Sequence, residues 1–529
     1  MKSLTKLMAM GLLSVGLASC SSDDENLPQG GTDFGVADKV YMSLNLSYPT
    51  QRAVGDPAIE IGTEGENKVS TVQVILKKGT AIAASSIGNF AGPTAQGNNQ
   101  RYTATFNAKD LLGLAGQDGV ELYAICNGVT TPLDLVGDKK ALTSTDFSTL
   151  ANEAYWKSNG FLMANADGAA TTSIPAKEIL MAQNSTQGTA LNLGVVEVER
   201  AAARIDYQTK QLNNEYPIDD QGGKKVATIN LDGYTLGHVS KEFYTMIRTN
   251  DGTDGGLATL GKAGGLYVVD VDWAQTPNLI QPAVSNPDIN TQVGAYVNYA
   301  YSNLDALANP DNWNGADGQR NDYKLMSYVS ENTVPADKNK WDKKGYATAV
   351  YFKGYIEANT ETPTELKTAI ESNNPLVVYN NMLLGDWAMV EALAAGTGEE
   401  PGNPFAGKPS EFAGFKTNYE LAKNDGLNAS TEITHEIAKN HGFTIYETDG
   451  TAGKHEVYYP YWNEHDAANM EYAVVRNNVY KLQINNILKY GLPRNGSVDP
   501  EEPIKSNDVY FQLAVDVLPW AVKVNDIEF

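Results

Sequence analysis

Lys39-Val-Tyr-Met-Ser-Leu-Asn-Leu-Ser-Tyr48 alternates apolar and more polar residues along its whole length. Successive side chains of a β-strand point to opposite faces, so alternation of this kind predicts a strand with one buried face. The side chains of that face would be those of Val40, Met42, Leu44, Leu46 and Tyr48. The residues between them would face the other way. The rest of the sequence can be interpreted outward from this strand.

The chain in front of the strand begins as an export signal. Lys2 and Lys6 form a short positive region, and an apolar run follows at 7–17, shorter than the about 20 residues that cross a bilayer. The run ends in Leu17-Ala18-Ser19-Cys20, which matches the lipobox of bacterial lipoproteins. We therefore expect a lipoprotein signal peptide at 1–19 and a lipid on the thiol of Cys20. An ordinary secretory signal with an incidental cysteine is the alternative.

Polar segments flank the strand on both sides. Residues 21–31 are acidic and contain glycine, a composition that predicts an unfolded tether. An acidic run after a lipidated cysteine also resembles the signal that sends some lipoproteins to the outer face of the outer membrane. Residues 49–57 hold two prolines and a glycine, which predicts an exposed loop. Its lone Arg52 would be open to an Arg-specific or trypsin-like protease, although an ordinary loop arginine fits the sequence as well.

Composition indicates a large, acidic, strand-rich protein. At 529 residues the chain is long enough for two or more domains. A formal charge of −24 argues against nucleic acid as a partner, because nucleic-acid binding needs a basic surface. Helices are expected to be few, and the best candidate starts at Thr362, with Glu365 completing a capping box. Further alternating stretches predict half-buried strands at 69–76, 101–106, 120–126, 346–356, 455–459 and 479–484.

A change of composition near residue 195 suggests a domain boundary. A Gly-, Asn- and Thr-rich stretch at 184–194 gives way there to a run that starts with Val195. We therefore expect an N-terminal domain at 53–194 and a C-terminal domain at 195–529. Cys126 lies in an apolar run and is expected to be a small buried hydrophobe on a strand. If Cys20 is lipidated, Cys126 has no partner for an intramolecular disulfide.

A second strand of interest lies at the end of the chain. Apolar residues alternate from 509 to 517, and Pro519 is expected to break the strand. The apolar positions of this segment are Val509, Phe511, Leu513, Val515 and Val517, followed by Trp520. Such a terminal strand could belong to a sheet of its own domain or complete the sheet of a neighbouring molecule.

No catalytic constellation stands out in the sequence. His435-Glu436 is followed by His441, six positions after the first histidine, and this spacing separates the two rings around a helix. We therefore expect no metal site, no cofactor and no enzyme activity. The aromatic residues Tyr458, Tyr459, Tyr461 and Trp462 could stack on sugars, but burial in a core is the preferred interpretation.

Several motifs together resemble the Mfa-type fimbrillins, the subunits of type V pili in the FimA/Mfa-like family. In the second half of the chain they are 458–462 with 474–484, the closing 515–520, and Ser330-Glu331-Asn332-Thr333 ahead of the strand at 346. Val198-Glu199-Arg200 with the following 201–204, the lipobox, the first strand and Arg52 match in the first half. The likeness is vague from about 53 to 181, and the insertion before the last strand is shortened to 493–508.

This resemblance implies a mainly β fold of two transthyretin-like β-sandwich domains with a few short helices. It also implies a route of assembly at the cell surface. The lipidated propeptide at 20–52, which includes the first strand, would be removed by a cut between Arg52 and Ala53. The groove left by Val40, Met42, Leu44, Leu46 and Tyr48 would accept a donor strand at 509–529 of another copy. Donor residues would be Val509, Phe511, Leu513, Val515, Val517 and Trp520.

The implied partners are further copies in a head-to-tail fibre, anchor and tip subunits, and the protease; an adhesion receptor cannot be identified. A tip adhesin or a surface glycan-binding lipoprotein is the alternative function. A tip subunit is expected to lack a usable C-terminal donor strand, and an anchor subunit to lack the cleavage site. A glycan-binding lipoprotein would keep both its lipid and its first strand.

Overall fold

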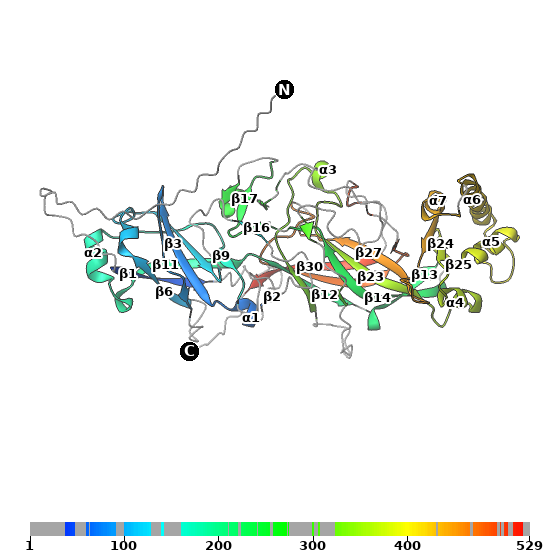
Figure 1. Ribbon diagram of the computed structural model, residues 1–529, viewed down its shortest axis with the longest axis horizontal. Helices are drawn as coiled ribbons and strands as arrows, with labels where there is room; N and C mark the ends of the chain where they lie inside the picture. The colour runs from blue at the N-terminus through cyan, green and yellow to red at the C-terminus, as the bar shows by residue number, and fades with distance from the viewer. Residues whose placement is uncertain are drawn as a thin grey trace, which may run out of the picture.

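Strands dominate the computed structural model of the chain, as the sequence predicts (Figure 1). The structure describes residues 38–47, 60–62, 64–90, 100–128, 139–141, 160–209, 211–220, 224–240, 242–253, 258–271, 273, 299–300, 305–306, 323–429, 432–465, 469–494, 498, 502–505 and 511–521. Within these ranges, no helix combines the length and the apolar character needed to span a membrane. The molecule is elongated, with the first sheet at one end and a group of helices at the other.

The N-terminal sandwich is built from one nine-stranded sheet with the order β4-β3-β7-β9-β11-β1-β6. The short β10 and β5 pair with β7 and β3 outside this path. The sheet curls so that its last strand returns to β3, where the Tyr102 hydroxyl donates to the Val72 carbonyl at 3.1 Å. The strands are β1 Lys39–Ser47, β3 Thr71–Lys78, β4 Ala81–Ala84, β5 Gly88–Asn89, β6 Gln100–Asn107, β7 Val120–Cys126, β9 Met163–Asn165, β10 Ala170–Thr172 and β11 Leu191–Arg200. Cys126 is a free, fully buried cysteine at the end of β7, as expected.

The C-terminal sandwich is formed by two sheets that face each other, with the orders β2-β30-β28-β12-β22 and β13-β14-β23-β27-β29. Their side chains meet in one core: the rings of Tyr207 and Phe352 lie 5.4 Å apart, and the Tyr216 hydroxyl donates to the Ile484 carbonyl. The first sheet contains β2 Glu60–Ile61, β12 Ala203–Thr209, β22 Lys324–Val329, β28 Asn478–Ile487 and β30 Phe511–Ala521. The second contains β13 Glu215–Asp220, β14 Lys224–Gly237, β23 Ala349–Glu357, β27 His455–Trp462 and β29 Leu492–Pro493, with β21 Asp305–Ala306 paired to β14.

The remaining elements are short strands and helices around the two sandwiches. Small sheets are formed by β15 Val239–Ser240 with β20 Tyr299–Ala300, by β16 Glu242–Tyr244 with β8 Lys139–Ala141, and by β17 Arg248–Asn250 with β18 Thr259–Leu260 and β19 Tyr267–Val268. A last one joins β24 Leu376–Tyr379, β25 Met382–Asp386 and β26 Phe443–Tyr446. The helices are α1 Glu64–Asn67, α2 Lys177–Gln183, α3 Lys338–Trp341, α4 Thr364–Ile370, α5 Trp387–Ala395, α6 Pro409–Asn428 and α7 His435–Asn440.

An insertion with its own core separates β23 from β27, which are neighbours in the sheet. It contains α4 to α7 and the sheet of β24, β25 and β26, and it occupies the end of the molecule farthest from β1 (Figure 1). Phe412, Phe415 and Tyr419 of α6 are buried on one helical face against Phe405 and Phe443. The mainly β prediction is therefore confirmed, while the 20 residues of α6 exceed the short helices that were expected.

The helix predicted at Thr362 is present as α4, but the capping prediction was wrong. Helix α4 starts at Thr364, and Pro363 occupies the N-cap position without a side-chain cap. The Thr362 hydroxyl instead donates to the Val226 carbonyl at 2.7 Å and accepts from the Asn359 amide. This hydroxyl ties the start of the insertion to β14, so tertiary contact takes the place of local capping.

Strand β11 of the first sandwich extends past the predicted boundary at residue 195, as far as Arg200. Strand β11 continues through Gly194, which has a φ of +103°, and the pairing of β11 with β1 shifts register at this point. A glycine at positive φ in a shifted ladder is a bulge within a strand and not a linker. The domain limits at 53–194 and 195–529 remain predictions, but residues 195–200 belong to the first sheet.

Burial of β1 leads to a first prediction. Leu44→Ala should destabilise the uncleaved protein by about 2–5 kcal/mol, because Leu44 is fully buried and its truncation leaves a cavity. Leu427→Ala is the control, since Leu427 is 69% exposed, and it should cost less than about 0.5 kcal/mol. Urea unfolding of both variants measures the difference. Equal midpoints would show that β1 is not part of the cooperative core.

Candidate functional site

Strand β1 fills a gap between two other strands. On one side it runs parallel to β11, with Met42 opposite Leu191 and Ser47 opposite Glu197. On the other side it is antiparallel to β6, from Lys39 opposite Asn107 to Leu46 opposite Gln100. Figure 1 shows β1, β6 and β11 together in the N-terminal sandwich. If β1 were absent, both β11 and β6 would present unpaired backbone groups to the same slot.

The predicted buried face of β1 is observed. Val40 is 1% exposed, and Met42, Leu44 and Leu46 are fully buried. Ser43, on the opposite face, is also 1% exposed, and its hydroxyl accepts a hydrogen bond from Arg101 Nη2 of β6 at 3.2 Å. The slot beneath β1 is therefore apolar on the core side and has a cationic side chain at its rim.

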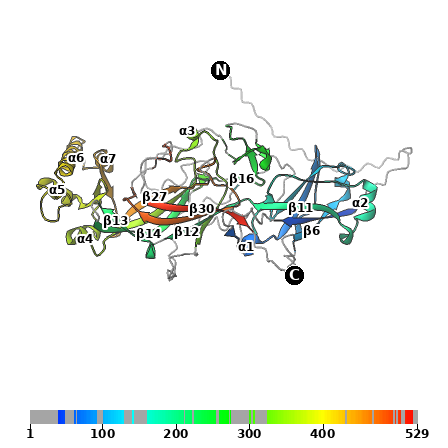
Figure 2. The same cartoon turned by 180° about the vertical axis from the view of Figure 1, so that it is seen from behind.

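The C-terminal strand β30 is held less completely than β1. It pairs antiparallel with β28 from Phe511 opposite Ile487 to Pro519 opposite Asn478. On its other side, within the described part of the chain, it pairs with the two residues of β2, opposite Trp520 and Ala521. In Figure 2, β30 runs along the C-terminal sandwich towards α1 and the N-terminal sandwich. A strand with one full neighbour can leave a sheet by breaking a single long ladder.

The expected break at Pro519 was wrong, because β30 continues through this residue to Ala521. Pro519 lies opposite Asn478, the first residue of β28, and β2 begins its pairing one residue later. A proline lacks an amide hydrogen, and a strand without a continuous neighbour on its second side tolerates that loss.

Other predicted residues lie outside the described part of the chain. They are the lipidation site Cys20, the processing residues Arg52 and Ala53, Tyr48 of the first strand and Val509 of the last one. Phe511, Leu513, Val515, Val517 and Trp520 lie within β30, where the backbone pairing is known.

Three motifs that the sequence analysis left without a role meet between the two sandwiches. Arg476 is 2% exposed and forms a bidentate pair with the fully buried Glu331, with Nε–Oε1 and Nη2–Oε2 distances of 2.6 and 2.5 Å. Arg200 donates through Nη1 to Asn477 Oδ1 at 3.2 Å. Asn332 and Val474 form a bridge between their backbones. The motifs at 198–204, 330–333 and 474–478 therefore form one buried polar junction.

Helix α1 joins this junction from the N-terminal side. Glu66 is 3% exposed and its carboxylate pairs with Arg204 Nη1 at 3.1 Å, while the Tyr328 hydroxyl donates to it at 2.7 Å. Arg204 also pairs with Asp206 at 2.7 Å. Arg200 Nε donates to the Glu66 carbonyl at 3.1 Å. Buried charges need such partners, so the segment that follows the expected cleavage site is anchored on the C-terminal sandwich.

Burial changes the ionisation of the Glu199 carboxyl in the junction. It is 6% exposed, and burial raises its pKa to about 7, although Lys262 at 3.4 Å and Arg476 favour the charged form. Near neutral pH this group can therefore exchange a proton while it remains buried between the sandwiches.

The aromatic residues considered for sugar binding are largely buried, and the histidines considered for a metal site contact carboxylates. Tyr458 and Tyr459 are fully buried and Trp462 is 9% exposed, so the preferred interpretation of this cluster as core is confirmed for them. His435 contacts Glu447 and His441 contacts Asp425, at 2.8 and 2.7 Å. In the part of the chain that the structure describes, no group of three or more His, Cys, Asp and Glu side chains could hold a metal ion.

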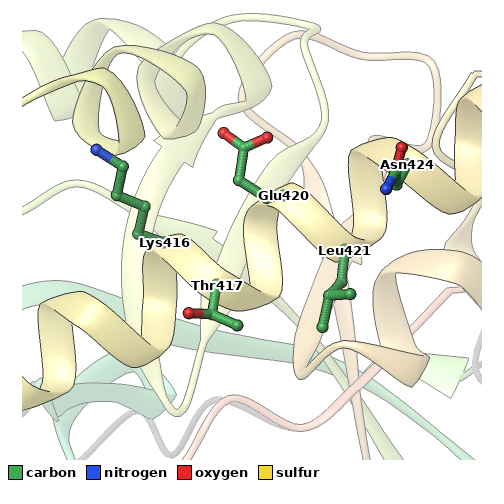
Figure 3. Close-up of a pocket in the computed structure, with 5 residues that line it drawn as sticks. All are labelled: Lys416, Thr417, Glu420, Leu421 and Asn424. Atoms are coloured by element: carbon green, nitrogen blue, oxygen red, sulfur yellow. The ribbon is translucent and has the colours of Figure 1, made fainter.

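A shallow depression of about 380 Å³ lies on the outer face of α6 in the insertion. Figure 3 shows the five side chains that line it, all from this one helix: Lys416, Thr417, Glu420, Leu421 and Asn424. Leu421 is 45% exposed. The depression lies far from β1 and β30 along the molecule (Figure 1) and holds no nucleophile paired with a base.

The C-terminal part of the chain is similar to a known protein family. Residues 453–526 match the family model described as major fimbrial subunit protein type IV, fimbrillin, C-terminal. This range contains β27, β28 and β30 and one of the three motifs of the polar junction. The predicted resemblance to the fimbrillins is thus confirmed, and the family supports a fimbrial role at the cell surface, structural or adhesive.

Solved structures similar to the chain include fimbrial proteins. A fimbrilin (FimA) from Porphyromonas gingivalis W83 is 14% identical, with 92% of this chain and 99% of that chain covered and a TM-score of 0.38. The tip fimbrial protein Mfa3 from Porphyromonas gingivalis is 11% identical, with 91% and 100% covered and a TM-score of 0.32. No curated protein matches the chain.

The buried ion pair of the junction yields a second prediction. Glu331→Gln should destabilise the protein by about 3–5 kcal/mol, because it leaves the guanidinium of Arg476 buried without a counter-charge. Glu371→Gln removes an exposed pair with Lys367 and should cost less than about 1 kcal/mol. Thermal and urea unfolding compare the two variants. A similar small loss in both would contradict a central role for the junction.

Glu199 yields a prediction about pH. Its pKa is raised from 4.5 to about 7 on folding, so the folded protein holds this proton more tightly than the unfolded chain. The contribution of Glu199 to stability is therefore present below pH 4.5 and is lost as the pH rises to about 7. Glu199→Gln should reduce the difference in urea midpoint between pH 5 and pH 8, whereas the exposed neighbour variant Glu197→Gln should not. An unchanged difference in Glu199→Gln would refute this assignment.

Proposed function

We propose that this protein is a structural subunit of a surface fimbrium that polymerises by donor-strand exchange. It is exported as a precursor lipidated at Cys20 and anchored to the outer membrane, and it is cut between Arg52 and Ala53. The observation that carries this proposal is the position of β1, a buried strand between β11 and β6. Its loss would open a slot that only another extended apolar strand can fill.

Cleavage after β1 suits the geometry of the precursor. Arg52 follows the last residue of β1 and precedes β2, so a cut there would leave β1 attached by non-covalent contacts alone. The mature chain would still be held by α1, whose Glu66 lies in the polar junction. Loss of residues 20–52 would therefore remove the first strand and the lipid together without removing the anchor of the new N-terminal segment.

Strand β30 has the properties expected of the donor. It repeats the alternation of β1, with Val509, Phe511, Leu513, Val515 and Val517 in alternate positions. Among the described strands it pairs along its length with β28 and at its end with the two residues of β2, so its release opens one long ladder and one short one. An extended apolar strand gains both buried side chains and backbone hydrogen bonds in an open slot, which makes such a contact slow to dissociate. Each subunit would then donate one strand and accept one, which gives a head-to-tail fibre.

A stalk position in the fibre accounts for both the C-terminal strand and the arginine in the loop after β1. A usable C-terminal strand argues against a tip subunit, and Arg52 argues against an anchor subunit. A glycan-binding lipoprotein is the alternative from another class, but burial of Tyr458, Tyr459 and Trp462 removes most of the aromatic surface that would bind sugar. Partners in the fibre would be copies of the chain and anchor and tip subunits, and an Arg-specific or trypsin-like protease would process the precursor.

Substitution of Arg52 tests this proposal. In protein sheared from cells, the mature chain should start at Ala53 and form ladders in SDS, whereas Arg52→Ala should remain uncut and monomeric because β1 still fills the slot. N-terminal sequencing and unheated SDS gels give both readouts. Arg52→Lys serves as the matched variant: a trypsin-like protease would still process it, and an Arg-specific one would not. Wild-type protein that stays lipidated and monomeric would refute the stalk function.

A further inference from the structure

Strand β30 carries a single charged residue, Asp516, among its 11 residues. In the folded chain Asp516 lies opposite Lys481 of β28. Lys481 is half-buried, and its Nζ lies 4.9 Å from the centre of the Tyr323 ring. Opposite charges across an antiparallel pair favour one register over its neighbours. Within its own molecule, the register of β30 therefore places its one carboxylate residue opposite a lysine.

Strand β6, at the rim of the slot, also carries a single charged residue, Arg101. Arg101 lies opposite Asn45 of β1 and donates to the hydroxyl of Ser43, its diagonal neighbour. Its side chain is otherwise exposed. An incoming strand would thus meet one cationic side chain on β6, beside the position that Asn45 occupies in the precursor.

We propose that Asp516 of the donor pairs with Arg101 of the acceptor and sets the register of strand exchange. This inference rests on the proposed function and specifies the partner at that site. The donor runs in the direction of β1, with Asp516 in the place of Asn45. Counting back along both strands, Phe511, Leu513, Val515 and Val517 take the places of Val40, Met42, Leu44 and Leu46. Asp516 is then placed opposite a cationic residue both within its own molecule, at Lys481, and between molecules, at Arg101.

A donor strand shifted by two residues, so that its earlier residues enter the slot, is disfavoured by charge repulsion. It would bring Val509 to the place of Val40 and Asp516 to the place of Ser47. Ser47 pairs with Glu197 of β11, so two carboxylates would meet. Like charges on directly opposite positions destabilise a sheet.

A donor strand shifted by two residues in the other direction is disfavoured because Pro519 would then lie between two paired strands. It would bring Pro519 to the place of Leu46, which is paired with Val196 on one side and Gln100 on the other. A proline between two strands loses a ladder hydrogen bond. A donor that ran in the opposite direction could reach Arg101 with Asp516 only by placing Pro519 at Met42, which is also paired on both sides.

A double-mutant cycle tests the charge pair in the full chain. Arg101→Glu and Asp516→Lys should each slow the polymerisation of cleaved protein by about fivefold, and the double variant should recover most of that loss. Asp516→Lys also puts like charges at the paired positions 481 and 516 inside the subunit. That effect is common to both proteins that carry it, so it cancels in the cycle. Strictly additive losses would overturn the proposal.

Engineered disulfides test the register itself. In the proposed register Ala514 takes the place of Ser43, opposite Thr103, so Thr103→Cys with Ala514→Cys should link subunits covalently. In the alternative with Val509 at Val40, Gln512 takes that place, and Thr103→Cys with Gln512→Cys is the matched control. Boiled, non-reducing gels detect the links, and the native Cys126 is fully buried.

The outcomes separate the two proposals. Covalent ladders from the Ala514 pair alone support this register, and ladders from the Gln512 pair alone overturn it. Unlinked subunits from both pairs, in protein that still forms SDS-resistant fibres, also overturn the register but leave strand exchange standing. Cleaved wild-type protein without any fibres refutes strand exchange, and the register with it.

Discussion

The double pairing of β1 is the constraint on which the rest of the structure depends. A nine-stranded sheet that contains β6 needs a strand between β6 and β11, because the two do not pair with each other. Strand β1 meets that need with four buried apolar side chains and with backbone ladders on both edges. It lies ahead of every other described strand in the chain and is the easiest inner strand to remove by a single cut. In the proposed assembly, the strand between β6 and β11 therefore comes from the same chain in the precursor and from another subunit in the fibre.

The polar junction explains how a subunit could lose β1 without coming apart. Arg200 of β11 with Asn477, and Glu66 of α1 with Arg204 of β12, join segments from both sandwiches by contacts that do not involve β1. Buried charged groups of this kind are costly to separate, which favours a fixed orientation of the two sandwiches. A fixed orientation suits a chain of subunits in which each one accepts a strand at one sandwich and donates a strand from the other.

Local pattern was enough to predict β1, β30 and six of the longer strands between them, because alternation is read from neighbouring residues. Val40 to Leu46 could be assigned to a buried face in this way, but the strands on either side of β1 could not, because they come from 100–107 and 191–200. The insertion was missed because α6 contains Gly414 and Gly426 and buries only a narrow apolar stripe. The partners of Arg200 and Arg476 are distant in sequence, so only the fold brings these motifs together.

The central claim is that the strand between β11 and β6 is supplied by another subunit in the assembled fibre. A cryo-electron microscopy map of native fibres at side-chain resolution tests it most directly. The account predicts density between β11 and β6 that fits residues 511–517, connected to the C-terminal sandwich of the next subunit, with nothing left of residues 39–47. Density that fits β1 of the same chain in that place, with β30 still paired to its own β28, would contradict the account.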